Sequence, residues 1–99
     1  MKSNVSKYDF QEAFNKMRPN AFSYQGLVAL YDYLINWEMS TGEELELDVI
    51  AICCDFCEYD SIKDFWADYD RDEYPDLDKI HEATEVIMCS NGHFIIRVM

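Results

Sequence analysis

The spacing of apolar residues in the first twenty positions predicts an amphipathic helix. After Ser6, apolar side chains recur with the spacing of one buried helical face, at Phe10, Ala13, Phe14 and Met17. Ser6 is a favourable N-cap, and Asp9 stands three residues later as in a capping box. Pro19 ends the helix, because the residue before a proline is steered away from helical geometry.

A second, longer helix is predicted after Ser23, which is again a suitable N-cap. Its apolar stripe comprises Leu27, Leu30, Tyr31, Leu34 and Ile35. Gly42 directly follows Thr41 and indicates the C-terminal end, since glycine readily adopts the left-handed conformation that closes many helices. We therefore expect two helices in the first half of the chain.

The run Val49–Cys54 consists of six apolar residues flanked by Asp48 and Asp55. Six residues are short for a globular helix and typical of a strand that is buried on both faces. We therefore predict that the stretch Leu45–Glu58 contains the central strand of the fold, at Val49–Cys54.

After this strand the pattern predicts two further helices. Ser61 and Asp64 indicate the start of the first, and its apolar side comprises Ile62, Phe65, Trp66 and Tyr69. Pro75 separates this helix from a short helical segment near Leu77–Ala83.

Two strands, Glu85–Cys89 and Phe94–Val98, are predicted at the end of the chain. The segment Ser90–His93 joins them, and its Asn-Gly pair is the strongest short hairpin signal in a sequence. The order ααβααββ predicts one α+β domain over residues 1–99, with a three-stranded, mostly antiparallel sheet and helices packed mainly on one face. The last strand should lie between the other two, because a right-handed helical crossover can then join the first two strands.

Charge changes this picture from a generic small domain to an acidic one. Twenty acidic residues against eight basic ones give a net charge of −12. Residues 43–85 alone hold sixteen acidic and three basic residues, a net charge of −13. Such a charge excludes a general affinity for nucleic acid or anionic membranes. We expect an acidic face on a folded domain, because 49% of the residues are apolar.

The sequence also predicts a cytoplasmic protein. No apolar run approaches the length that spans a bilayer, and the first ten residues lack the apolar core of a secretion signal. The four cysteines are therefore expected to remain thiols, because the cytosol keeps them reduced.

The middle of the chain carries a recognisable run of motifs. These are Asn20–Leu27 (NAFSYQGL), Ala29–Leu34 (ALYDYL), Thr41-Gly42-Glu43 and Glu46–Cys54 (ELDVIAICC). Together they cover roughly residues 20–60, and the chain resembles here a family of short acidic proteins of phages, prophages and other mobile elements. The resemblance implies a setting in which small acidic proteins bind host defence machinery, as anti-CRISPR and anti-restriction inhibitors do.

Four acidic residues after the predicted central strand have a helical spacing. Asp60, Asp64, Asp68 and Asp72 recur every four residues, so on a helix they would lie on one face, about 6 Å apart along the axis. This is comparable in scale to the axial spacing of phosphates in a nucleic-acid strand, about 3.4 Å. We therefore predict a nucleic-acid-mimicking surface that inhibits a basic, nucleic-acid-binding host protein, without binding nucleic acid or membrane directly.

The residues predicted to contact this partner are carboxylates of the acidic segment, with two tyrosines as contact anchors because aromatic residues are enriched in protein interfaces. They are Glu58, Tyr59, Asp60, Asp64, Asp68, Asp70, Asp72, Glu73, Tyr74 and Asp76. The alternative is an acidic surface that only keeps the protein soluble and monomeric. We predict no cofactor and assign no oligomeric state.

Four possible zinc ligands give a second hypothesis. Cys54 and Cys57 form a Cys-x-x-Cys pair, and Cys89 and His93 could complete a tetrahedral site across the sheet. Cysteine is also among the most buried residue types, so Cys53, Cys54 and Cys89 fit core packing better than a zinc site. A metal-stabilised module is thus the second hypothesis, and an adaptor within a phage complex is the third.

The sequence does not predict catalysis or a calcium loop. Neither His81 nor His93 stands beside a recognisable nucleophile, and His93 is expected in the hairpin turn. Asp68–Asp72 imitates the start of an EF-hand loop, but Glu73 and Lys79 stand where that loop needs glycine and a bidentate glutamate. We therefore expect a non-enzymatic protein.

Overall fold

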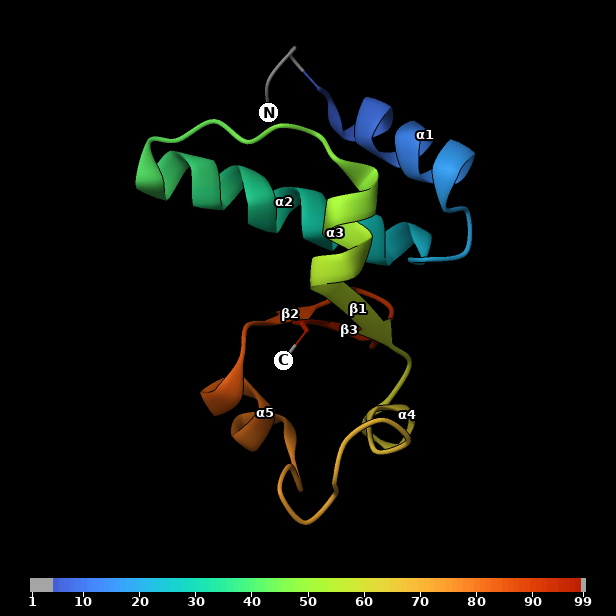
Figure 1. The fold of residues 1–99 in the computed structure, drawn as a ribbon, viewed down its shortest axis with the longest axis vertical. Coiled ribbons are helices and arrows are strands. Elements are labelled where there is room, and N and C mark those ends of the chain that lie inside the picture. The colour runs from blue at the N-terminus through green and yellow to red at the C-terminus, as the bar shows by residue number, and fades with distance from the viewer. Residues whose placement is uncertain (1–4, 99) are drawn as a thin grey trace.

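The first two helices begin and end where their caps predict, in a computed structural model that describes residues 5–98 (Figure 1). Helix α1 spans Lys7–Met17 and helix α2 spans Tyr24–Thr41. The Asp9 N–H donates to Ser6 Oγ at 3.1 Å, and the Ser6 N–H donates to Asp9 Oδ2 at 3.2 Å, which confirms the capping box. Gly42 ends α2 in the left-handed conformation, with φ of 74°.

The predicted central strand at Val49–Cys54 is wrong, because this run forms helix α3 (Val49–Asp55). The Asp48 side chain caps the helix by accepting the Ala51 N–H at 3.0 Å. The run has a buried side, Val49 and Ile52, and an exposed side, Ile50, Ala51 and Cys54. A run that is apolar throughout therefore packs on one side only, at helical spacing.

The sheet has three strands, β1 (Phe56–Tyr59), β2 (Val86–Met88) and β3 (Phe94–Arg97). Its order is β1-β3-β2, and both outer strands pair with β3 in antiparallel fashion. The α+β class, the three-stranded sheet and the central position of the last strand are confirmed. The hairpin between β2 and β3 forms as predicted. Its tight turn uses Gly92 in the left-handed conformation, with φ of 85°. The order differs by the additional helix α3, after which the first strand begins at Phe56.

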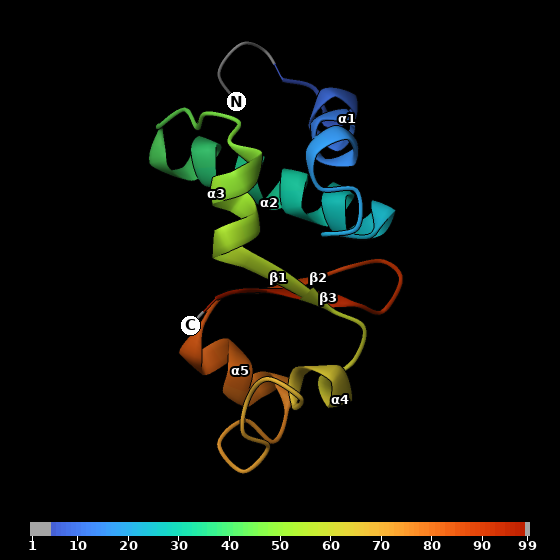
Figure 2. The same cartoon turned by 45° about the vertical axis from the view of Figure 1, so that its right-hand side comes forward.

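Helices cover both faces of the sheet (Figures 1 and 2). Most helical residues lie on one face as predicted, in α1, α2 and α3, but the short helices α4 (Ile62–Phe65) and α5 (Leu77–Ala83) cover the other face. Successive side chains of a strand point to opposite faces of the sheet. The side chains of β3 therefore pack alternately into the two cores. Ile95 belongs to the core beneath α2, whereas Phe94 and Ile96 belong to the core on the α4–α5 side.

Candidate functional site

Residues 60–78, which we call the acidic lobe, lie on the far side of the sheet from α1 and α2 (Figure 1). They comprise α4, a stretch of turns and the start of α5. The carboxylate residues of this lobe are all exposed: Asp60, Asp64, Asp68, Asp70, Asp72, Glu73, Asp76 and Asp78. The structure therefore places the predicted aspartates and Glu73 together on one side of the molecule.

An aromatic core holds the acidic lobe against the sheet. Phe65 is fully buried and stacks on Tyr69 with ring centroids 4.6 Å apart. The Trp66 Nε1–H donates to the Tyr74 carbonyl at 2.8 Å, which ties the two ends of the turn region together. The carboxylates thus project from a packed scaffold rather than from a loose loop.

Basic side chains do little to neutralise the lobe. Within residues 5–98, its carboxylates form no ion pair with lysine or arginine. Lys79 pairs with Glu82 at 3.4 Å, and the Arg71 guanidinium lies over the Trp66 ring, 4.6 Å from its centroid. The lobe therefore presents a strongly negative surface to an approaching molecule.

The predicted helical row of aspartates is wrong. Helix α4 ends at Phe65, and residues 66–75 form turns. Asp68 instead accepts a hydrogen bond from the Tyr59 hydroxyl at 3.0 Å, and Asp70 accepts the Asp72 N–H at 2.9 Å. Any mimicry of nucleic acid must come from charge density, because the carboxylates do not follow a regular helical spacing.

Of the two predicted tyrosine anchors, Tyr59 is wrong as an exposed contact residue, whereas Tyr74 as a partner contact stays a prediction. Tyr59 is only 5% exposed and packs edge-on against Phe65. Burial, together with hydrogen bonding to Cys57 and to the Asp68 carboxylate, which accepts from the hydroxyl, raises the pKa of the Tyr59 hydroxyl far above its ordinary value. Tyr74 is half-buried and packs edge-on against the Phe65 ring. Both tyrosines therefore build the scaffold of the lobe.

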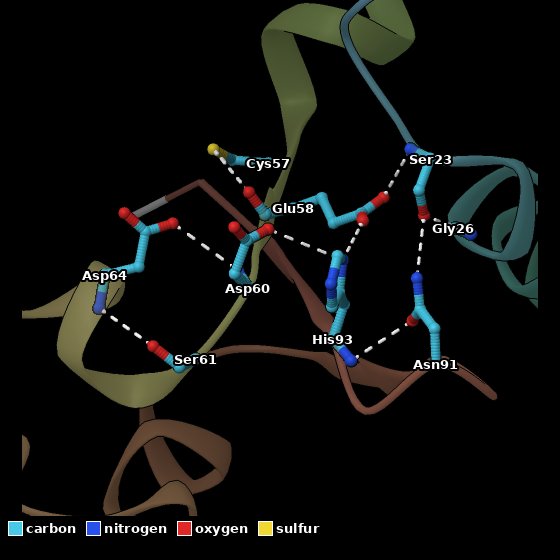
Figure 3. Close-up of polar contacts among 9 residues, drawn as sticks. All are labelled: Ser23, Gly26, Cys57, Glu58, Asp60, Ser61, Asp64, Asn91 and His93. Atoms are coloured by element: carbon cyan, nitrogen blue, oxygen red, sulfur yellow. Dashed lines mark hydrogen bonds and ion pairs between the residues drawn. The ribbon is translucent and has the colours of Figure 1, made fainter.

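Glu58 joins three segments beside the lobe (Figure 3). Its side chain is 7% exposed. One carboxylate oxygen accepts the Ser23 N–H at 2.9 Å, and the other lies 2.7 Å from His93 Nδ1. The N-terminus of α2, strand β1 and the hairpin thus meet at one buried carboxylate, so Glu58 is not available as the predicted partner contact.

Further polar contacts surround Glu58 at this junction of α2, β1 and the hairpin. Asn91 Nδ2–H donates to Ser23 Oγ at 3.3 Å, and Ser23 Oγ also accepts the Gly26 N–H at 3.0 Å. Asp60 Oδ1 lies 3.5 Å from His93 Nδ1. The hydrogen bond with Glu58 raises the pKa of His93 despite some desolvation, and the charge of Asp60 adds to that rise.

Chemically, the junction is a structural clamp. In the part of the chain that the structure describes, the His93 ring pairs with two carboxylates and with no serine or cysteine. Sequence reasoning placed His93 in the turn but missed its link to Glu58. The antiparallel register pairs Glu58 with Ile95. His93 lies two residues before Ile95, so it becomes a diagonal neighbour of Glu58 only once that register is known.

The four residues of the zinc hypothesis do not converge. Cys54 is exposed on α3, Cys57 packs on the α4–α5 side of the sheet, and Cys89 is buried beneath α2. Between residues 5 and 98, no three histidine, cysteine or acidic side chains are grouped to hold a metal ion. Burial raises the pKa of Cys57 and raises that of Cys89 to about 11, which disfavours the thiolate that metals bind. His93 is already held by Glu58.

Comparisons of the chain with protein-family models, curated proteins and solved structures find no match. Across residues 5–98, no helix is both long and apolar enough to cross a membrane. The fold is that of a small α+β protein, and the resemblance to phage proteins stays a prediction. The acidic lobe is therefore the feature from which a function is best argued.

Proposed function

We propose that the protein is a non-enzymatic inhibitor whose acidic lobe occupies the basic, nucleic-acid-binding groove of a defence protein in the cytoplasm of a bacterial host. One observation carries this proposal. Exposed carboxylates gather on a scaffold fixed by buried aromatic residues, and no lysine or arginine within residues 5–98 pairs with them. The resemblance to small acidic phage proteins is consistent with such a setting.

Electrostatics explains how the lobe would act. The lobe, residues 60–78, holds eight acidic residues and two basic ones, Lys63 and Arg71, a net charge of −6. A basic groove attracts such a surface from a distance, and salt screens the attraction over a Debye length of about 8 Å at physiological ionic strength. Binding to the partner should therefore weaken as salt rises.

Not every acidic residue of the lobe can be substituted to test charge alone, because Asp68 and Asp70 also hold its shape. Asp68 accepts a hydrogen bond from Tyr59 of β1 and Asp70 accepts one from the Asp72 N–H, so changing either side chain alters the shape of the lobe. The side chains of Asp72 and Glu73 are exposed and accept no hydrogen bond in the described structure. The double variant Asp72→Lys/Glu73→Lys therefore changes charge with little change in fold.

A matched control lies on the other side of the sheet. Glu43 and Glu44 are exposed in the segment between α2 and α3, and Glu43→Lys/Glu44→Lys changes the net charge by the same amount. Each immobilised variant is incubated with nuclease-treated bacterial lysate, washed with rising salt, and the retained proteins are identified by mass spectrometry.

The proposal expects a nucleic-acid-binding protein that is retained at low salt and released at moderate salt. The Asp72→Lys/Glu73→Lys variant should lose this protein, whereas Glu43→Lys/Glu44→Lys should retain it. Equal loss in both variants would indicate a general charge effect and contradict a specific lobe. A partner that resists salt and has no nucleic-acid role would favour the adaptor hypothesis instead.

A further inference from the structure

Strand β2 is an edge strand with unused hydrogen-bonding capacity. In its pairing with β3, the Cys89 N–H donates to His93 and the Arg97 N–H donates to Glu85. Hydrogen-bonded and non-hydrogen-bonded pairs alternate along an antiparallel ladder. Val86 and Met88 are therefore the non-bonded positions, and the N–H and C=O of both point away from β3 towards the open edge.

A groove of about 450 Å³ runs along this edge between β2 and α2. Its α2 wall includes Val28, Ala29 and Asp32, and its β2 wall includes Val86 and Met88. Met88 is 56% exposed. The groove lining is mixed, with Gln25, Asn36 and Ser90 beside the apolar residues. An exposed sheet edge beside such a groove is an arrangement that accepts an extended peptide as an added strand.

A second cavity meets the groove at Met88. It has a volume of about 500 Å³ and an apolar lining that includes Leu77 and Phe94, with Asp76 and Asp78 beside them. A lysine or arginine side chain suits this combination, because its aliphatic stem packs on apolar surface while its charged end reaches a carboxylate. Side chains of an added strand alternate between two faces, so one set would face α2 and the other this cavity.

We propose that the β2 edge binds an extended basic segment of a partner protein, which adds a fourth strand to the sheet. The main chain of Val86 and Met88 supplies the hydrogen bonds, and Asp76 and Asp78 select basic side chains. The net charge of −12 favours a basic segment and opposes a second copy of this chain at the same edge. This surface shares Asp76 and Asp78 with the acidic lobe, but it depends on the main chain of β2, and its test does not need the lobe's partner.

The test uses a seven-residue peptide of alternating lysine and valine, capped at both ends. Titration is followed by the amide resonances of isotopically labelled protein and by amide hydrogen exchange. We expect saturable shifts at Val86 and Met88 and slower exchange of their N–H groups. Shifts confined to the acidic lobe, with no change at β2, would overturn the proposal.

Two further peptides of identical charge separate strand addition from plain electrostatic attraction. One is N-methylated at its valines and the other at its lysines. Only alternate residues of an added strand turn their N–H towards β2, so one methylated peptide should lose at least tenfold in affinity while the other binds within about threefold of the parent. Equal affinities for the two, whether strong or weak, would overturn the proposal.

A pair of protein variants tests the edge itself. Met88→Pro removes the outward N–H without removing a ladder bond, and proline is tolerated on edge strands with that orientation. Met88→Thr keeps the N–H. We expect at least a tenfold loss of peptide affinity in Met88→Pro and less than a threefold change in Met88→Thr. Protection of the Met88 N–H from hydrogen exchange without peptide, to a degree that rises with protein concentration, would overturn the proposal. That result would assign the β2 edge to a second copy of this chain.

Discussion

Replacing Gly26 with alanine places a methyl group where the Glu58 carboxylate lies. A Cβ built at Gly26 overlaps Glu58 Oε1. Because the Glu58 side chain is almost fully buried, it moves only by giving up its bonds with Ser23 and His93. A hydrogen bond to a charged group contributes about 1.5–3 kcal/mol.

Alanine also brings a gain, because it is a better helix former than glycine by about 1 kcal/mol. Loss of both bonds less this gain gives a net destabilisation of about 2–5 kcal/mol for Gly26→Ala. Urea unfolding at pH 7, followed by circular dichroism, measures this change in the free energy of unfolding.

The same substitution should cost much less once the carboxylate is absent. In a Glu58→Ala background the methyl group meets no carboxylate, and the Ser23 Oγ at 3.1 Å is its remaining close neighbour, so Gly26→Ala should be within about 1 kcal/mol of neutral. A double-mutant cycle with the two single variants and the double variant isolates this coupling. An equal effect of Gly26→Ala in both backgrounds, or a Gly26→Ala protein no less stable than the wild type, would show that the methyl group does not displace the Glu58 carboxylate.

Three further predictions concern the core, the junction and the thiols. Phe65→Ala should destabilise the protein by about 3–5 kcal/mol in urea unfolding, because Phe65 is fully buried among the aromatic residues of the lobe; a change below about 1 kcal/mol would contradict that packing. The hydrogen bond with Glu58 raises the pKa of His93 above 6.5, so its stabilisation is complete below that pH and is lost as pH rises through the raised value. Unfolding from pH 5.5 to 9 should therefore show the wild type losing stability relative to His93→Gln, and parallel curves would count against the ion pair. A thiol reagent should modify exposed Cys54 before buried Cys89, whose pKa is raised to about 11, and mass mapping showing the reverse order would contradict the burial of Cys89.

Local signals in the sequence predict much of the fold. The capping residues Ser6 and Ser23, Gly42 after α2 and the Asn-Gly pair of the hairpin act within a few residues of their own position. Each therefore has the same meaning in the isolated sequence and in the folded chain. The central position of β3 also follows from a general rule on crossover connections.

The helix α3 could not be distinguished from a strand by its apolar run alone. Such a run has no periodicity, so burial on one side or on two is decided by the neighbouring elements. The Asp48 N-cap is a local signal for the helix, whereas the shortness of the run favours a strand. Here the tertiary packing of Val49 and Ile52 decides the structure.

The acidic residues of the site were predicted, but their arrangement was not. Like charges four residues apart destabilise a helix by about 0.2–0.5 kcal/mol a pair, which opposes a helix through Asp64, Asp68 and Asp72. Aspartate side chains also compete for nearby backbone N–H groups and favour turns, as Asp70 does with the Asp72 N–H. The aspartates whose spacing predicted a helical row therefore help to end helix α4 and favour turns after it.

We propose that the acidic lobe and nucleic acid compete for one groove on the host protein. The most direct measurement is the displacement of a labelled nucleic acid from the captured host protein, followed by fluorescence anisotropy at several salt concentrations. The wild-type protein should displace the nucleic acid, less effectively as salt rises, and Asp72→Lys/Glu73→Lys should be at least tenfold weaker than Glu43→Lys/Glu44→Lys. Simultaneous binding of the protein and the nucleic acid, or equal displacement by the two variants, would contradict the account.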